Sequence, residues 1–559
     1  MRPRRLRAGA GASATPAGSS PAPTTRWDPR RASIALALVL TLVLVGLHLV
    51  FHAHAGPLWR DEVNSVNVAS SPSLSDVFAR ARFDSFPAAW TAILHLSLGL
   101  GSGDADRDGR RLGLVIGLVT IASVWWAGRR LGVAAPVVAL LLFAMSPSVI
   151  IYGDAVRGYG LGAAALLWCA GSLWAYVERP GARRLALAFM ASLAAVQTHY
   201  ANCLLLLAAG AGAAAVVLRE RNFRALASLA LLGMGAALSV VIVNRGALEY
   251  MTQTAPLIVA TWPTAFLIEV FAHAIGAGVT PLSIAWALAG VLALAGLALA
   301  FRPGSDPADV DRALFCGVTI ILGLVVYFIA LRSTGVGIQY WHYLSLMGLC
   351  ALILDVGSGL FAARWWWGGW ARVAIVAVLA LASVRDVAEA VRLRMTDVDL
   401  AAREIARRGG PGDLVVVLPW YAGVTFDRYY RGSTPWITIP DLPEHKVHTH
   451  LAIRDRMKIG SRAVDDELSR VERVLRGGGQ VFVVGVVAAP DQGAPPAELP
   501  AAPGGPRGWH ADPYLESWEL QLGALLERHG VERERVTLPP VGSVNAWESL
   551  PVGVVRGWR

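Results

Sequence analysis

Two adjacent carboxylates, Asp61 and Glu62, follow the first long apolar stretch of the chain. Their side chains diverge by about a quarter turn in a helix, so one can act chemically while the other braces it or binds a ligand. A carboxylate at an apolar boundary has its pKa raised by desolvation, and a neighbouring cation such as Arg60 keeps it ionised, which suits a general base. The alternative interpretation is a solvated helix cap without chemistry.

A third carboxylate, Asp154, ends another apolar run and is followed three residues later by Arg157. A spacing of three predicts that both side chains lie on one face of a helix. The pair indicates either a second acidic position of a site or a local ion pair that stabilises a helix end.

Histidines are the weaker candidates. His199 and Tyr200 end an apolar run, where such a pair is more often an interfacial anchor than part of a site. His445, His448 and His450 could bind a metal ion, but no Cys or Asp completes the set at a recognised spacing. The sequence therefore predicts no metal-binding residues.

The elements that must position these residues belong to a membrane protein. The chain has 559 residues, of which 55% are hydrophobic, and its mean hydropathy is +0.49. Soluble domains are far less apolar. Apolar runs long enough to cross a hydrocarbon core of roughly 30 Å recur from residue 32 to residue 384. We predict about eleven transmembrane helices in this part of the chain.

The positions of the arginines predict the orientation. Lys and Arg in short loops stay on the cytoplasmic side of a membrane. The N-terminus is therefore expected to be cytoplasmic, with residues 1–31 as a disordered tail that is rich in Ala, Gly, Ser and Pro. Clusters at residues 1–7, 128–132 and 219–224 then share the cytoplasmic face.

The first outer loop, residues 52–111, holds the adjacent carboxylates. Within it, the segment from Pro87 to Leu100 is too short for a span and predicts an interfacial helix. With this alternation, Asp61, Asp154 and His199 all fall on the outer face.

From residue 385 to residue 559 the pattern becomes that of a soluble α/β domain. Because the last predicted span exits outward, we expect this domain to be extracytoplasmic and residues 32–384 to form the membrane domain. Helix-like and strand-like segments alternate at Leu400–Arg408, Asp413–Leu418, Asp465–Arg476 and Gln480–Val487.

Charge and cysteine content exclude some classes. The net charge of +10 needs no nucleic-acid partner, because arginines in cytoplasmic loops face anionic lipid headgroups. Lysine occurs only at Lys446 and Lys458, a bias that indicates a GC-rich prokaryotic genome and hence a plasma-membrane location. No disulfide framework is expected, because all cysteines fall in apolar spans, at Cys169, Cys203, Cys316 and Cys350.

Several short motifs follow one another in a fixed order along the first part of the chain. They are Asp61-Glu62, Asp84-Ser85-Phe86-Pro87, Arg110-Arg111-Leu112, Gly128-Arg129-Arg130-Leu131-Gly132, the segment from Ser146 to Tyr159, and Thr198-His199-Tyr200. Their order and sidedness resemble the C-type integral-membrane glycosyltransferases, most closely the protein mannosyltransferase and aminoarabinose transferase branch. The resemblance covers roughly the first 200 residues by motif and the rest by architecture.

The resemblance implies a sugar donor carried on polyprenyl phosphate and an acceptor on protein, lipid or polysaccharide. It implies that Asp61 is the general base for the acceptor hydroxyl, that Glu62 supports it or binds the acceptor, and that Asp154 is the second acidic position. Negative charge develops on the leaving phosphate and must meet a cation; a divalent cation is left open as a cofactor. The candidates for binding the donor phosphate are Arg157, His199, Tyr200, Arg332, Gln339 and Tyr340.

The chain departs from the family at two places. Ser85-Phe86-Pro87 stands where the family often has His-Pro-Pro, and Gln339-Tyr340 stands where an Arg-Tyr pair often opens a late span. Glutamine carries no charge for a phosphate. Either Arg332 or His342 compensates, or the donor binds in an altered way, or the protein is no longer active.

Two other functions compete with a transferase. A non-catalytic scaffold for envelope assembly would tolerate both departures. A polytopic transporter would place ionisable residues near the bilayer midplane and often contains repeated halves, neither of which the sequence indicates.

Overall fold

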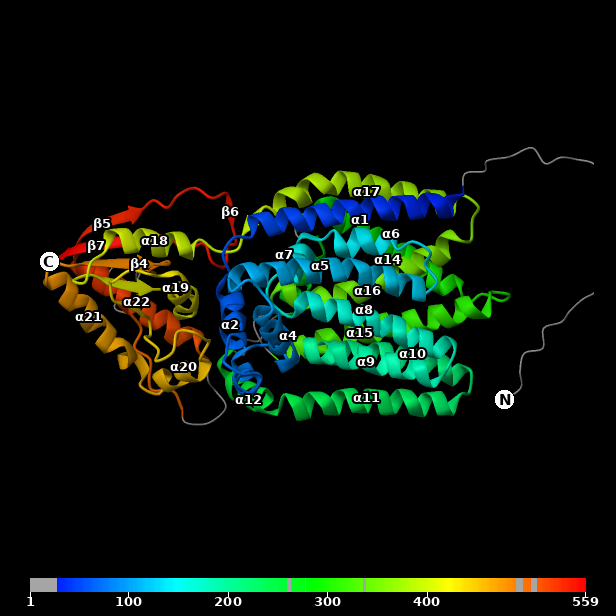
Figure 1. The fold of residues 1–559 in the computed structure, drawn as a ribbon, viewed down its shortest axis with the longest axis horizontal. Coiled ribbons are helices and arrows are strands. Elements are labelled where there is room, and N and C mark those ends of the chain that lie inside the picture. The colour runs from blue at the N-terminus through cyan, green and yellow to red at the C-terminus, as the bar shows by residue number, and fades with distance from the viewer. Residues whose placement is uncertain (1–27, 259–262, 277, 335–337, 489–495, 504–509) are drawn as a thin grey trace, which may run out of the picture.

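The computed structural model describes residues 28–258, 263–276, 278–334, 338–488, 496–503 and 510–559. Most of the predicted N-terminal tail lies outside these residues. A bundle of long helices lies end to end with a smaller C-terminal part built around a sheet, and α2 (Arg60–Ala69) lies between them (Figure 1). The mostly helical fold with a C-terminal α/β domain confirms the fold class predicted from the sequence.

Helices of the bundle run alongside one another (Figure 1). Their bounds are α1 Pro29–His54, α5 Ala105–Arg130, α6 Val137–Ala139, the π-helix η2 Leu140–Ala144, α7 Pro147–Gly153, α8 Tyr159–Glu178, α9 Ala182–Thr198, α10 Asn202–Arg219, α11 Phe223–Val243, α14 Thr280–Leu299, α15 Pro307–Thr334, α16 Leu344–Ala362 and α17 Gly368–Ala390. The last of these continues past the predicted domain boundary at residue 384.

Within the described residues, 8 helices are long and apolar enough to cross a membrane. They are α1, α5, α8, α10, α11, α14, α15, and α16 together with the turn before it. The helices α9 and α17 and the interrupted helical segment α6–η2–α7 lie in the same bundle (Figure 1). The count of about eleven spans stays a prediction.

Burial within the bundle is uneven. Of the 18-residue apolar stretches in α8 and α16, 78% and 83% of the residues are buried, so these two helices form the centre of the bundle. Peripheral helices instead expose large apolar side chains, such as Leu42 of α1, Met234 of α11 and Leu381 of α17. Apolar surface on this scale is unfavourable in water and suits contact with lipid.

Short helices cover the end of the bundle that faces the C-terminal part. Their bounds are α2 Arg60–Ala69, α3 Leu74–Arg80, η1 Ala81–Phe83, α4 Ala88–Gly99, α12 Arg245–Ile258, α13 Thr264–Gly276 and η3 Tyr340–Tyr343. The predicted interfacial helix corresponds to α4, which begins after Pro87.

The C-terminal part contains a five-stranded sheet in the order β3-β2-β4-β7-β5, and a two-stranded pair, β1 with β6. Strands β2, β3 and β4 are parallel, and β7 and β5 add antiparallel strands at one edge. The strands are β1 Leu393–Arg394, β2 Leu414–Val417, β3 Trp436–Thr438, β4 Gln480–Val484, β5 Gly530–Val536, β6 Ser543–Val544 and β7 Val552–Trp558.

The helices of this part are α18 Val398–Arg408, η4 Trp420–Ala422, α19 Gly423–Tyr429, α20 His450–Met457, η5 Gly460–Val464, α21 Asp465–Arg476 and α22 Asp512–His529. All four residues of β2 are buried, because apolar helix faces cover both sides of the sheet. The predicted helices and strands of the domain are therefore confirmed near their predicted bounds.

Candidate active site

The start of α2 carries the adjacent carboxylates and is anchored from two sides. The backbone N–H of Trp59 donates to the Glu62 carboxylate at 3.1 Å. The backbone N–H of Arg60 donates to the carboxyl oxygen of Glu548, from the C-terminal part, at 2.9 Å. The first N–H groups of a helix have no partner inside it. These two acceptors therefore fix where α2 begins, one residue before Asp61.

Glu62 is fully buried, and its hydrogen bonds all run to the surrounding protein. Its Oε1 accepts from the Arg110 guanidinium at 2.5 Å and from the backbone N–H of Val156 at 2.8 Å. The same guanidinium donates to the carbonyl oxygens of Gly56 and Pro57. Charge-assisted bonds of this kind are strong and directional. Glu62 therefore joins α2 to α5 and to the segment before α8.

Arg157 lies against α2 from the side of the bundle. Its Nη1 donates to the Asp84 carboxylate at 2.9 Å, to the Ser65 hydroxyl at 2.8 Å and to the Asp61 carbonyl at 3.0 Å. The guanidinium lies 4.7 Å from the centre of the Phe86 ring. Its Nε is buried and has no hydrogen-bond partner among the described residues. The cation is thus fixed beside Asp61.

The prediction that Asp154 and Arg157 share a helical face is wrong. They lie in the irregular segment between α7 and α8, where helical spacing does not apply. Asp154 pairs instead with His48 of α1 at 2.7 Å, and both side chains are buried. Arg157 pairs with Asp84. Asp154 therefore braces α1 against the bundle, and its role as a second acidic position stays a prediction.

Asp61 keeps 22% of its side chain exposed and lies among cations. The Arg60 Nε is 3.6 Å from its Oδ1. Burial raises the pKa of the Asp61 carboxyl, but the guanidinium groups of Arg157 and Arg60 outweigh burial and hold the pKa below its ordinary value of 3.8. The carboxylate is therefore ionised at neutral pH, as a general base must be before it accepts a proton.

The C-terminal part brings His448 and His450 within electrostatic reach of this carboxylate. The backbone N–H of His448 donates to the Asn64 side chain of α2 at 2.9 Å, and both imidazoles pack edge-on against Trp420. Burial lowers the pKa of His448 to about 3 and that of His450 to about 4, so both rings are neutral at neutral pH. In the part of the chain that the structure describes, no group of three or more His, Cys, Asp or Glu is placed to hold a metal ion.

Further contacts hold the C-terminal part over α2. The Asp106 carboxylate, at the start of α5, accepts from the Arg428 guanidinium and, at 2.8 Å, from the Tyr429 hydroxyl. The Arg60 guanidinium lies 4.6 Å from the centre of the Tyr421 ring. The candidate site is therefore bounded by the membrane bundle on one side and by the C-terminal domain on the other.

The turn η3 adds residues that the sequence assigned to the donor phosphate. The Tyr340 hydroxyl accepts from the Trp547 indole N–H at 3.2 Å. The backbone N–H of Gln339 donates to His342 Nδ1 at 3.1 Å, and His342 interacts electrostatically with Asp61. That His342 compensates for the missing arginine charge stays a prediction.

The remaining predicted residues are spread out. His199 packs 5.7 Å from Phe86, the ring that supports Arg157, and its Nδ1 lies 3.5 Å from the Ser345 hydroxyl. The Tyr200 hydroxyl is buried and has no hydrogen-bond partner among the described residues. Arg332 lies exposed in the last turn of α15. The structure thus places His199 beside Phe86 and Arg332 at a helix end, and their roles in binding the donor phosphate stay predictions.

Three residues that organise the site were not predicted from the sequence. Asp84 and Arg110 stand in the motifs of the resemblance, where a carboxylate before an interfacial helix and an arginine before a span were the available signals. Glu548 lies 488 residues from its partner Arg60, in a segment without a recognisable motif. No local signal could have found it.

The buried carboxyl of Glu548 is expected to make the stability of the folded protein depend on pH. Burial raises the pKa of its carboxyl to about 8, more than the nearby Arg60 guanidinium lowers it. The folded protein therefore holds a proton that the unfolded chain has lost, and stability falls as the pH rises from 4.5 to 8. We expect the melting temperature to fall across this window in the wild type and to fall much less in Glu548→Gln. Parallel curves for the two proteins would contradict this assignment.

Two kinds of solved structure are similar to this chain. ArnT from Cupriavidus metallidurans bound to undecaprenyl phosphate is 14% identical, with a TM-score of 0.48, and covers 81% of this chain and 92% of its own. The Archaeoglobus fulgidus oligosaccharyltransferase in complex with Zn and sulfate is 13% identical, with a TM-score of 0.46, and covers 80% and 68%. No protein-family model and no curated protein matches the chain.

The likeness is one of overall fold. The roles of individual residues rest on the contacts described above.

Proposed function

We propose that this membrane protein transfers a sugar from a polyprenyl-phosphate donor to a hydroxyl group of an acceptor, at the membrane face that carries α2. The observation that carries the proposal is the setting of Asp61: an ionised, partly exposed carboxylate beside a fixed arginine, between an apolar bundle and a folded domain. A lipid-bound donor needs an apolar approach, and a polar acceptor needs an aqueous one.

The proposed reaction balances as a single displacement. Asp61 accepts the proton of the acceptor hydroxyl, and the acceptor oxygen forms a bond to the anomeric carbon of the sugar. The bond between that carbon and the phosphate oxygen breaks, and the phosphate leaves with the electron pair. Negative charge then grows on the phosphate and is stabilised by a cation already in place.

Arg157 is suited to meet the leaving phosphate. Its Nη1 is occupied by Asp84, Ser65 and the α2 backbone, which fixes the guanidinium before substrate binds. A preorganised cation of this kind stabilises charge without reorganisation during the reaction. Glu62 and Asp84 act as positioning residues, one for α2 and one for Arg157.

Donor transfer by the purified protein tests the proposal. The full chain is reconstituted in liposomes with a panel of radiolabelled polyprenyl-phosphate sugars and a membrane-envelope extract as the acceptor source. We expect one donor to label the acceptor fraction and to release free polyprenyl phosphate in equal amount. A folded, correctly inserted protein that consumes no donor would favour the scaffold. Movement of labelled lipid or sugar across the liposome membrane without transfer would favour the transporter.

A further inference from the structure

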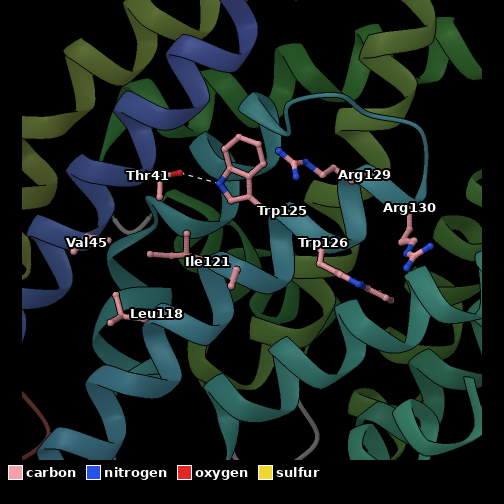
Figure 2. A pocket seen from close by; sticks show the side chains of 9 residues that line it. Thr41, Val45, Leu118, Ile121, Trp125, Trp126, Arg129 and Arg130 are labelled. Atoms are coloured by element: carbon pink, nitrogen blue, oxygen red, sulfur yellow. Dashed lines mark hydrogen bonds between the residues drawn. The ribbon is translucent and has the colours of Figure 1, made fainter. Parts of the chain in front are cut away.

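A groove opens between α1 and α5 at the end of the bundle remote from α2. It has a volume of about 680 Å³, and its walls come from aliphatic and aromatic side chains of the two helices. Trp125 and Trp126 line it, and Arg129 and Arg130 stand at its rim (Figure 2). The arginine pattern predicts that this end of the bundle is cytoplasmic.

The aromatic walls are held in place by their own contacts. The indole N–H of Trp125 donates to the Thr41 hydroxyl of α1 at 2.9 Å, as the dashed line in Figure 2 marks. Trp126 stacks on Trp168 of α8 with ring centres 5.0 Å apart and planes 12° from parallel. A Cβ at Gly171 would come within 2.5 Å of the Trp126 ring, so glycine makes room for it. The walls of the groove are therefore already in place without a ligand.

The cations at its rim are not neutralised by carboxylates. Arg129 lies 5.1 Å from the centre of the Trp125 ring, and Arg130 lies 5.4 Å from the centre of the Trp126 ring. Neither makes an ion pair with a carboxylate in the described ranges of the chain. Resting on aromatic faces, both guanidinium groups keep N–H donors for an anion.

A second cavity of about 270 Å³ adjoins the first across Trp126. Arg130 lines both cavities, and Arg183 and Arg184 from the start of α9 line the second. The Arg184 guanidinium donates to the carbonyl oxygen of Arg179 at the end of α8. The apolar groove therefore ends at a cluster of basic side chains from the end of α5 and the start of α9.

We propose that this groove binds one anionic phospholipid, with an acyl chain between α1 and α5 and its phosphate between Arg129 and Arg130. An apolar groove that ends at cations matches a lipid whose acyl chain carries a negatively charged headgroup. A zwitterionic headgroup brings its own cation and gains less from the arginines. Inorganic phosphate could pair with the arginines at the rim but would leave the apolar groove empty. The site lies at the opposite end of the bundle from Asp61 and does not depend on the proposed function.

Native mass spectrometry of the delipidated full chain in detergent tests the site. Phosphatidylglycerol and phosphatidylcholine with identical acyl chains are titrated onto the wild type. They are also titrated onto R129Q/R130Q and onto R224Q/R302Q, which removes the same charge from two exposed arginines at the same bundle end. We expect a one-to-one phosphatidylglycerol complex in the wild type and the control, and an affinity lower by roughly thirtyfold in R129Q/R130Q.

Equal binding of the two lipids, or an equal loss in R129Q/R130Q and R224Q/R302Q, would overturn the proposal, because either result means a general surface charge. Inorganic phosphate that displaces the lipid at millimolar concentration would reduce the site to an anion site at the rim. W126A keeps both arginines and removes the shared wall, so unchanged phosphatidylglycerol binding by W126A would also overturn it. Gel filtration and melting temperature show that each variant is folded before it is titrated.

Discussion

Asp61→Asn is expected to lower the rate of sugar transfer by about 10²- to 10⁴-fold while the protein stays folded. Asparagine has nearly the same shape but cannot accept the proton of the acceptor hydroxyl. The Asp61 side chain makes no hydrogen bond that the described structure needs, since its contacts with Arg157 run through the backbone carbonyl. The fold should therefore survive. The measurement is initial transfer of radiolabel in liposomes at matched protein content.

Glu249→Gln is the matched control for this experiment. Glu249 is an exposed carboxylate on α12, at the same end of the bundle, and it also pairs with an arginine, Arg245, at 2.8 Å. Its loss should leave transfer and melting temperature unchanged, because exposed ion pairs contribute little. Wild-type transfer by Asp61→Asn would mean that another group accepts the proton, and the neutral His448 would then be the next candidate.

Much of this architecture could be predicted because its signals are local. Apolar runs indicated the long helices, and a short run after Pro87 indicated α4. A helix-like and a strand-like segment indicated α18 and β2 within a few residues of their observed bounds. In each case the residues that decide the structure are neighbours in sequence.

The hydrogen bonds and ion pairs of the site could not be predicted, because they join segments that are distant in sequence. Asp61 was found as a carboxylate at an apolar boundary, but its cation Arg157 is fixed by Asp84, 73 residues away. The spacing of Asp154 and Arg157 was misleading, since the backbone between α7 and α8 is not helical. Sequence spacing identifies partners only inside regular elements.

The histidines of the C-terminal part illustrate the same limit. His448 and His450 looked like an incomplete metal set when only their own neighbourhood was considered. In the structure they belong to a wall that closes over α2, where Asn64 holds the backbone of His448. Burial against the rest of the protein lowers the pKa of both imidazoles, and the Asp61 carboxylate of α2 opposes this shift.

Glu62→Ala is expected to destabilise the protein by about 3 to 5 kcal/mol, because it leaves the buried Arg110 guanidinium without its carboxylate. Glu62 is fully buried, whereas the Arg245–Glu249 pair is exposed, so Glu249→Ala serves as the control with an expected change near zero. The measurement is the unfolding midpoint of the detergent-solubilised protein, followed by the fluorescence of its tryptophans. A second change, Arg110→Met, should restore part of the loss, since the uncompensated charge is then removed as well.

This comparison separates the two roles that the sequence left open for Glu62. If Glu62 braces α2, stability and transfer fall together in Glu62→Ala, and both recover in part when Arg110→Met is added. If Glu62 instead binds the acceptor, transfer is lost at an unchanged unfolding midpoint, and Arg110→Met does not rescue it. The three bonds to Trp59, Arg110 and Val156 occupy the carboxylate before any substrate arrives, which is why we expect the first result.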